Sequence, residues 1–208
     1  MSPKVNEEYK EQKKREILNT AIAVFTRKGY TDTTMKDIVE ESGMSRGAVY
    51  SYFSSTEEMM VAILGLLDTE NQEQLQTAVN ADSQAGVWDR IENFIQEGIQ
   101  DIDNQKRGLT PALYEFFLNL YRQGKSYSLV AGRYDAALEM FAGLFQRGVD
   151  AGEFKPLVPV WVIAAMMITM MDGLVLDSCM LGTEKIMLEE QMSASLHAVR
   201  HLLGVDQG

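Results

Sequence analysis

The residues whose types and spacing most clearly indicate a function lie together at 35–53, which read MKDIVEESGMSRGAVYSYF. Two short helical patterns meet there across Gly43, Met44 and Ser45, a connection of the length that a helix-turn-helix uses. Gly43 suits the left-handed backbone that such a tight turn demands. Pairs of short helices divided by glycine also occur in proteins that bind no nucleic acid, so the spacing needs support from the surrounding residues.

The second helix of this pair has a small and polar outward side. With Val49 turned inward, a helical projection places four residues outward or at its edges: Gly47, Ser51, Tyr50 and Ala48. Arg46 lies at the helix start, where a guanidinium can reach a guanine edge or a phosphate, and where free backbone N–H groups favour a phosphate. A helix of this kind can enter a major groove, so the residues favour binding to duplex DNA.

The distribution of charge restricts where nucleic acid could bind. The chain has 208 residues and a net charge of −11, and residues 61–208 carry ten basic and twenty acidic side chains. Residues 10–56 carry eight basic and six acidic side chains and form the only basic segment. Because phosphate repels an acidic surface, any contact with DNA must come through this end. Lys13, Lys14 and Arg15 could reach the DNA backbone or minor groove, or could simply form a solvated face.

Helical periodicity and helix-capping residues predict an all-α protein with nine helices and no sheet. Three helices form an N-terminal head, expected at residues 1–55, and six form a C-terminal body, expected at residues 56–208. The expected helices are residues 9–28, 34–42, 45–53, a long helix from 55, 87–102, 110–122, 126–150, 156–180 and 183–203.

The compartment expected from the sequence is the cytoplasm. Cys179 is the only cysteine, which excludes an internal disulfide, and residues 1–16 show no apolar leader. Residues 158–176 contain only one charged residue, Asp172, and approach the length of a membrane span. They lack a flanking basic cluster and aromatic belts, so we expect a helix buried in protein and no membrane partner.

The run FTRKGYTDTTMKDIVEESGMSRGAVYSYFSSTEEM resembles the N-terminal signature of the tetracycline-repressor (TetR) family of transcription regulators. The resemblance covers residues 16–67 and rests on Phe25, Gly29, Tyr30, Thr34, Ile38, Gly43, Ser45, Gly47, Tyr50, Tyr52, Phe53 and Glu57 or Glu58. Two positions depart from it. Many relatives have Lys where this chain has Thr56, and many have Ala where it has Val39.

The resemblance implies that Thr34, Tyr50 and Tyr52 bind phosphates and that residues 45–48 lie against base edges. Together with the outward positions found above, the expected DNA-binding residues are Thr34, Lys36, Ser45, Arg46, Gly47, Ala48, Tyr50, Ser51 and Tyr52. The expected function is that of a repressor on a near-palindromic operator. A ligand-independent architectural or division-linked regulator is the alternative.

The resemblance also implies a homodimer formed by the last two helices of each chain. The sequence agrees, because five apolar residues recur there at three- and four-residue spacing: Leu188, Met192, Leu196, Val199 and Leu203. We expect these five residues at the dimer interface, where a twofold pairing would present two heads to one operator.

A pocket for a small apolar effector is expected in the body. The aromatic and Met residues that could line it, with one carboxylate, are Tyr114, Phe117, Tyr121, Phe141, Phe145, Met166, Met170 and Asp172. The same residues could instead be ordinary core. Asp172 could balance a cationic ligand, cap a partner helix or face the subunit interface.

The sequence gives little support to an enzyme. It has no Gly-rich phosphate loop and no nucleophile beside a base, so no catalytic residue and no cofactor are expected. His197 and His201 have a metal-compatible spacing, which leaves a metal-binding helical enzyme as a remote alternative, but two histidines near a helix end favour solvated surface. We therefore expect no metal.

Overall fold

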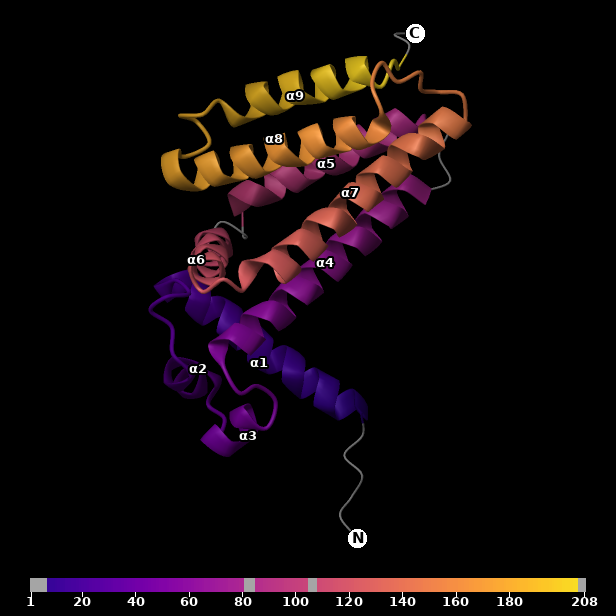
Figure 1. Ribbon diagram of the computed structural model, residues 1–208. Coiled ribbons are helices and arrows are strands. Elements are labelled where there is room, and N and C mark those ends of the chain that lie inside the picture. Colours follow the sequence, from indigo (N-terminus) through magenta and orange to yellow (C-terminus); the bar gives the residue numbers. More distant parts are fainter. Residues whose placement is uncertain (1–6, 81–84, 105–107, 206–208) are drawn as a thin grey trace. The chain divides into compact units, whose positions relative to one another are not determined.

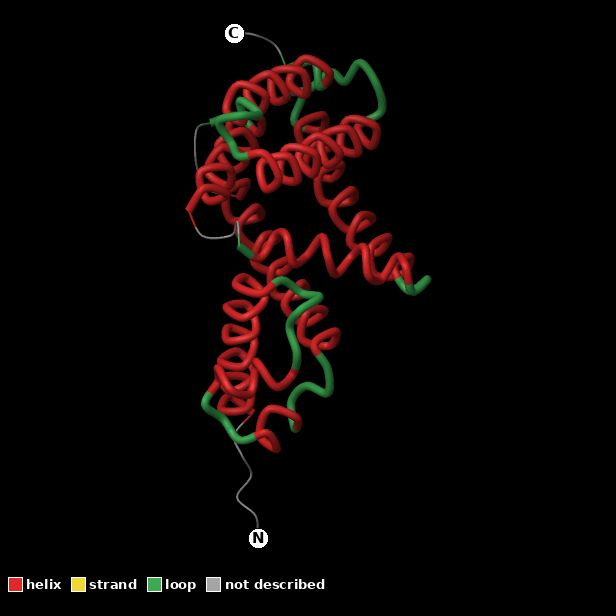
Figure 2. The backbone as a smooth tube through the Cα atoms, turned by 90° about the vertical axis from the view of Figure 1, so that its left-hand side faces the viewer, coloured by secondary structure: helices red, strands yellow, loops and turns green. Residues whose placement is uncertain are grey.

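The protein is helical throughout the part that its structure, a computed structural model, describes: residues 7–80, 85–104 and 108–205. Those ranges contain nine α-helices and no strand (Figures 1 and 2). The helices are α1 (Glu7–Lys28), α2 (Met35–Ser42), α3 (Arg46–Tyr50), α4 (Thr56–Asn80), α5 (Val87–Asn104), α6 (Leu109–Arg122), α7 (Ser126–Asp150), α8 (Val160–Leu181) and α9 (Leu188–Leu202). The expected all-α class is confirmed.

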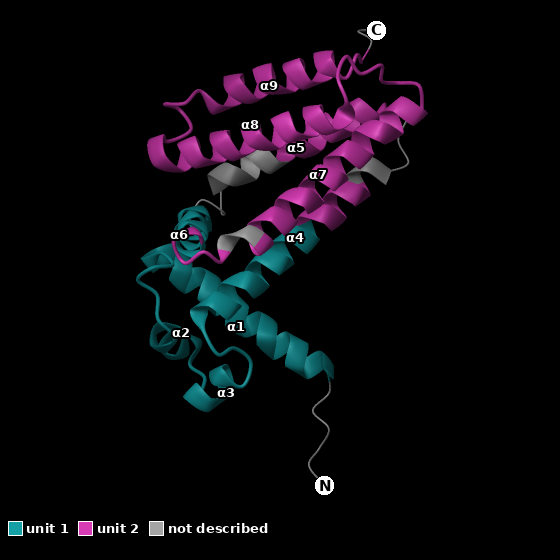
Figure 3. Ribbon diagram, in the orientation of Figure 1, with its two compact units in different colours: residues 1–70, 108–120 teal, residues 71–107, 121–208 magenta. Residues whose placement is uncertain are grey.

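The chain forms two compact units (Figure 3). Unit 1 contains residues 1–70 and 108–120, and unit 2 contains residues 71–107 and 121–208. Unit 1 therefore extends past the expected boundary at residue 55, because it also includes the first part of α4 and most of α6. Sequence patterns could not group α6 with the head, since the contacts that join them are far apart along the chain.

The core of unit 1 begins with the apolar stripe of α1. Ile17, Ala21, Val24 and Phe25 have no exposed surface, as their helical spacing predicts. The two short helices each contribute one fully buried side chain, Ile38 of α2 and Val49 of α3, with further buried residues from α4 and α6. Burial of these apolar surfaces fixes short helices that could not persist alone.

Side-chain caps fix where the helices of unit 1 begin. The Ser55 hydroxyl accepts a hydrogen bond from the Glu58 backbone N–H at 3.1 Å, and the Glu58 carboxylate accepts one from the Ser54 N–H at 2.7 Å. The first of these bonds is half of a capping box at the start of α4. The second satisfies a backbone N–H one residue earlier.

In unit 2, α8 packs against both α7 and α9, and α5 packs against α7. One face of α8 enters the core with side chains such as Ile163, Ala164 and Met167. Among the described residues α8 is the one helix long and apolar enough to cross a membrane by length and composition. Only 28% of its most apolar window is buried within this chain, and the rest of that window is half-buried or exposed.

The last two helices start later than their patterns predict. Pro159 is the residue before α8, so this helix begins four residues after the expected start at 156. Residues 183–187 form turns instead of the first turn of α9. The reason is local, because Met187 has a left-handed backbone with φ 51° that interrupts the helix, and the Leu188 N–H bonds to the Thr183 carbonyl at 3.0 Å.

Asp37 ties α2 to the end of α1. Its carboxylate lies 2.8 Å from the Lys28 ammonium and accepts hydrogen bonds from the Thr34 N–H and hydroxyl at 2.8 and 2.6 Å. The Lys28 contact first, and then the two Thr34 contacts, hold the pKa of the Asp37 carboxyl well below its usual range. The ionised form is therefore the one that stabilises this corner of the head.

We predict that Asp37→Asn lowers the melting temperature at pH 7 and that the difference from wild type shrinks as the pH falls. A depressed folded-state pKa contributes stability above the unfolded value of about 4, and that contribution is lost as the pH drops through the folded value. Thermal melts followed by circular dichroism between about pH 7 and pH 2.5 measure this. Asp32→Asn, which changes an exposed carboxylate in the same loop, is the control. A difference that does not change with pH would show that the ionised carboxylate is unimportant.

Candidate nucleic-acid interface

The turn between α2 and α3 is built from local hydrogen bonds and one left-handed residue. Gly43 has φ 63°, which a residue with a side chain rarely adopts. The Ser42 hydroxyl donates to the Val39 carbonyl at 3.0 Å and accepts from the Met44 N–H at 3.2 Å. These bonds satisfy backbone groups that the end of α2 leaves free, so the helix-turn-helix expected from the sequence is present.

The short helix α3 is held at both ends. The Ser45 hydroxyl accepts from the Ala48 N–H at 3.2 Å, and the Ser51 hydroxyl donates to the Ala48 carbonyl at 2.7 Å. Val49 has no exposed surface, which turns the opposite side of the helix outward. Both hydroxyls remain exposed and keep lone pairs or sites for further hydrogen bonds.

Arg46 and Tyr50 form a pair on the outward side of α3. The Arg46 guanidinium carbon lies 5.0 Å from the centre of the Tyr50 ring, within the range of a cation–π contact. This contact limits the conformations of a long side chain while leaving its N–H donors available. The arrangement can present a cation and a phenol together to a base edge or a phosphate.

Thr34 caps α2 with the same atoms that a phosphate would use. Its hydroxyl donates to Asp37 and accepts from the Asp37 N–H at 3.3 Å, so both Thr34 and Asp37 complete a capping box. A phosphate at Thr34 would have to replace the Asp37 carboxylate. Lys36 is held more weakly. Its ammonium lies 3.5 Å from the Glu40 carboxylate in an exposed ion pair, which contributes little to stability.

The structure keeps the expected DNA-binding residues together and accessible. Seven of the nine are exposed, and Ala48 and Tyr52 are half-buried. They occupy the start of α2, the turn and α3, all within unit 1. Their accessibility leaves a continuous stretch of backbone and side-chain donors that a duplex could contact.

A connection that sequence patterns missed joins α6 to the loop between α1 and α2. The Glu115 carboxylate accepts a hydrogen bond from the Thr31 N–H at 3.0 Å, and a Cβ at Gly29 would lie 2.8 Å from a Glu115 oxygen. The carboxylate therefore fits because position 29 has no side chain. The Phe116 ring meets the Tyr30 ring edge-on at 4.9 Å. Glu115 and Thr31 are 84 positions apart in the chain, so no local pattern could have indicated the contact.

The expected effector residues fall into both units. Phe141 and Phe145 are buried in the core of unit 2, and Met166 and Met170 pack partly buried against that core. Tyr114 and Phe117 are half-buried in unit 1, whereas Tyr121 in unit 2 is 74% exposed. These positions agree with core roles for the two phenylalanines.

Asp172 lies on the exposed side of α8. Partial removal of its carboxyl from water raises the pKa of Asp172, and the positive charge of Arg133 on α7 opposes part of that rise.

The five residues expected at the dimer interface are buried within unit 2 itself. Leu188, Met192, Leu196, Val199 and Leu203 are each at most 5% exposed and belong to one core cluster with residues of α8. The spacing identified the apolar face of α9 but could not tell which surface it meets. Since buried side chains cannot touch a partner, a second subunit would contact the other face of α9.

That other face of α9 carries a shallow depression lined by Glu189, Glu190, Ser193, Ala194 and His197. His197 and His201 are both exposed, as expected for solvated residues near a helix end. Among the described residues, no group of three or more His, Cys, Asp or Glu side chains is placed to hold a metal ion.

Two family models match the chain. Residues 17–63 match the model described as "Bacterial regulatory proteins, tetR family", and residues 90–189 match "Tetracyclin repressor-like, C-terminal domain". The first match includes α2, the turn and α3, and the second includes most of the body.

Relatives agree with these matches. The HTH-type transcriptional regulator YfiR of Bacillus subtilis is 39% identical over 185 residues, which is 89% of each chain. The HTH-type transcriptional repressor KstR2 of Mycobacterium tuberculosis is 25% identical over 142 residues, 68% of each chain.

Solved structures share the fold at low identity. The SmeT–triclosan complex aligns with a TM-score of 0.75 and 18% identity over 91% of this chain and 90% of SmeT. Reduced NemR of Escherichia coli aligns with a TM-score of 0.76 and 15% identity over 94% of this chain and all of NemR. Family models, the YfiR relative and the helix-turn-helix together show that the chain belongs to the TetR family of helix-turn-helix transcriptional regulators, which are not enzymes.

Proposed function

We propose that this regulator is a repressor that binds a near-palindromic operator as a homodimer in the cytoplasm and is released by a small, mostly apolar effector. The observation that carries the proposal is the outward side of α2 and α3, where none of the nine expected contact residues is buried. The relative KstR2 is named as a repressor, which supports repression as the kind of regulation.

Charge supports DNA contact through the head alone. Residues 61–208 carry twice as many acidic as basic side chains, so the body would be repelled by a duplex. The basic residues near α3 are either exposed, as Arg46 is, or held in weak surface pairs, as Lys36 is. Such cations can exchange their partners for phosphates at little cost.

The surfaces that the chain leaves uncovered on α8 and α9 favour a twofold dimer. Trp161, Val162, Met180 and Leu181 of α8 are each more than half exposed. The exposed side of α9 includes Ala194 and Ala198, small residues that allow another helix to approach closely. We infer that a second copy covers these faces, which would replace water next to apolar side chains and hold two heads for successive major grooves about 34–36 Å apart.

An apolar effector is supported by the flexible residues of the body and by a neighbouring structure. Met166 and Met170 are only partly buried beside the core of unit 2, and thioether side chains adapt to varied ligands. SmeT, which shares the fold, has been crystallised with triclosan. We propose that the release signal uses α6, because Glu115 and Phe116 hold the loop that leads into α2.

We predict that selection from random duplexes enriches a sequence with twofold symmetry. Arg46→Ala should then weaken binding to that operator by about 1–3 kcal/mol and relax the preference at one base pair if it reads a base, or weaken all duplexes alike if it contacts phosphate. Competition measured by fluorescence anisotropy at fixed salt separates these results. Arg122→Ala, which removes an exposed arginine at the end of α6, should leave binding intact. Selection that enriches no sequence over random duplex would contradict a sequence-specific regulator.

We predict that Ala194→Glu combined with Ala198→Glu gives folded monomers. In a twofold dimer these substitutions place four carboxylates at one seam, where desolvation and repulsion oppose association. Light scattering should report half the mass of the wild type, while circular dichroism retains the helical spectrum. Ala136→Glu, at an exposed position of α7, is the matched control and should remain a dimer. A double variant that still dimerises would place the interface on another face.

We predict that triclosan, used as a probe, raises the melting temperature and weakens operator binding by about 10- to 100-fold, the usual range of allosteric coupling. Glu115→Ala should keep the rise in melting temperature but lose most of the weakening, because α6 would no longer hold the Thr31 backbone. Glu139→Ala, which removes an exposed carboxylate of α7, is the control and should behave as wild type.

Two results would overturn parts of this account. Full release of DNA from Glu115→Ala would remove α6 from the signal path. Failure of triclosan and of a wider panel of cationic, neutral and anionic compounds to change the melting temperature would favour a regulator that needs no ligand.

A further inference from the structure

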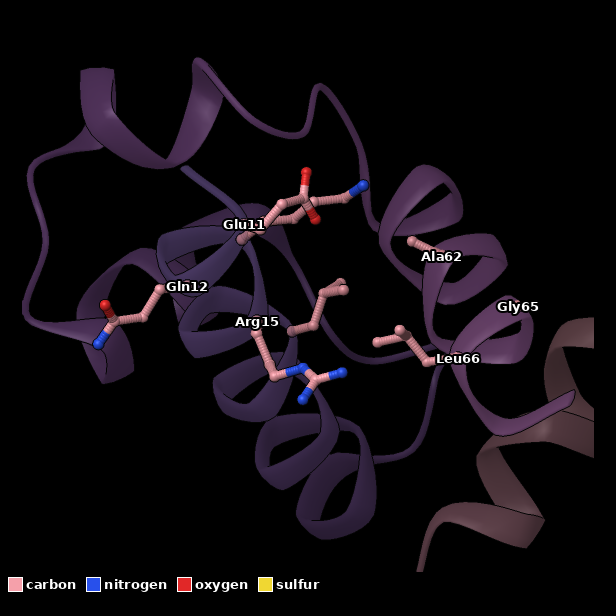
Figure 4. Close-up of a pocket in the computed structure, with 8 residues that line it drawn as sticks. Glu11, Gln12, Arg15, Ala62, Gly65 and Leu66 are labelled. Carbon is pink, nitrogen blue, oxygen red and sulfur yellow. The ribbon is translucent and has the colours of Figure 1, made fainter. Parts of the chain in front are cut away.

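We propose that unit 1 carries a second ligand site, a groove between α1 and α4 that takes a free single-chain amphiphile with an anionic head group. The groove encloses about 470 Å³, within the range of small-molecule sites. The residues that line it are Glu11, Gln12, Lys14, Arg15 and Leu18 of α1 and Ala62, Gly65 and Leu66 of α4 (Figure 4). All of them belong to unit 1, which also contains Tyr114 and Phe117 of the expected effector residues, whereas the other six expected effector residues lie in unit 2.

The floor of the groove is apolar and has open space above it. Leu18 is almost fully buried, and Ala62 and Leu66 are half-buried. At Gly65 an added Cβ would meet no atom within 4 Å, so α4 leaves room for an occupant there. An alkyl chain in this position would remove the exposed parts of Ala62 and Leu66 from water.

The rim carries two cations, Lys14 and Arg15, that form no ion pair with another described residue. In the first half of α1, Lys10 is paired with Glu7 at 3.0 Å and Lys13 with Glu16 at 2.6 Å. Lys14 and Arg15 line the groove, and no ion pair among the described residues includes either of them.

The positions of the charged residues predict how the ligand would be oriented in the groove. Figure 4 shows the Arg15 side chain extending from α1 toward the side of α4 that carries Leu66. Glu11 also lines the groove and would repel an anion at its own end. An anionic head group is therefore expected beside Arg15, where it can accept charge-assisted hydrogen bonds, with its chain over Leu18 and Ala62.

The consequence for regulation rests on the proposed function, although the binding itself does not. Lys14 and Arg15 belong to the only basic segment of an acidic protein. An anion bound over them would neutralise charge that otherwise attracts phosphate, so the amphiphile would weaken association with DNA from the head directly.

Isothermal titration without DNA tests the site with three probes of equal chain length below their micelle concentrations. Dodecanoate should bind about tenfold more tightly than dodecanol, because only the anion pairs with Arg15, and dodecyltrimethylammonium should bind least. Equal affinity for all three probes would contradict an anion site. Binding only to anionic vesicles, with none to monomeric dodecanoate, would assign the groove to a membrane surface and overturn the proposal.

Matched variants locate the binding. Gly65→Leu fills the groove and Arg15→Gln removes the cation, and each should lower dodecanoate affinity at least about tenfold. Gly132→Leu, the same change at an open helical position of α7, and Lys10→Gln, which removes a paired lysine, should bind as wild type. Circular dichroism melts confirm that each variant is folded.

A photoreactive dodecanoate analogue separates this site from one in the body. Labelling of peptides that contain residues 11–18 and 62–66 is expected, and it should disappear in Gly65→Leu. Labelling confined to peptides from residues 121–205, or unchanged in that variant, would overturn the proposal. Because no step uses DNA, failure here leaves the repressor function untouched, and failure to select an operator leaves this site untouched.

Discussion

The helix α3 has five residues and cannot hold its own shape alone, and the arrangement of the head follows from that constraint. α3 is fixed by one fully buried side chain, Val49, and by the Ser45 cap at its start. Gly43 allows the sharp turn that brings Ile38 of α2 into the same core. What remains outward is a surface with few large side chains and several hydrogen-bonding groups, which is what a major groove can accommodate.

The loop before α2 is also held in place, by contacts with α1 and α6. Asp37 joins the α2 cap to Lys28 of α1, and Glu115 of α6 holds the Thr31 N–H in the same loop. The start of α2 therefore depends on elements from two distant parts of the chain. A change in α6 could reach α2 by this short path, without any change in the core around Val49.

The helix caps and the tight turn could be predicted from local sequence signals. Contacts between distant parts of the chain could not. The caps Thr34, Ser45 and Ser55 and the turn at Gly43 were identifiable because each acts within four residues. The stripe of α9 was recognised as apolar, but its burial against the same chain depends on α8, which no spacing within α9 can reveal. The Glu115 contact and the division of the expected effector residues between two units were invisible for the same reason.

The central claim is that duplex DNA meets α2 and α3 and avoids the acidic body. Hydrogen–deuterium exchange of the full-length protein, with and without a selected operator duplex, measures this directly. The account predicts slower exchange for backbone amides in residues 34–36 and 45–52 and no change across α9. Protection in the body with unchanged exchange in α2 and α3 would contradict it.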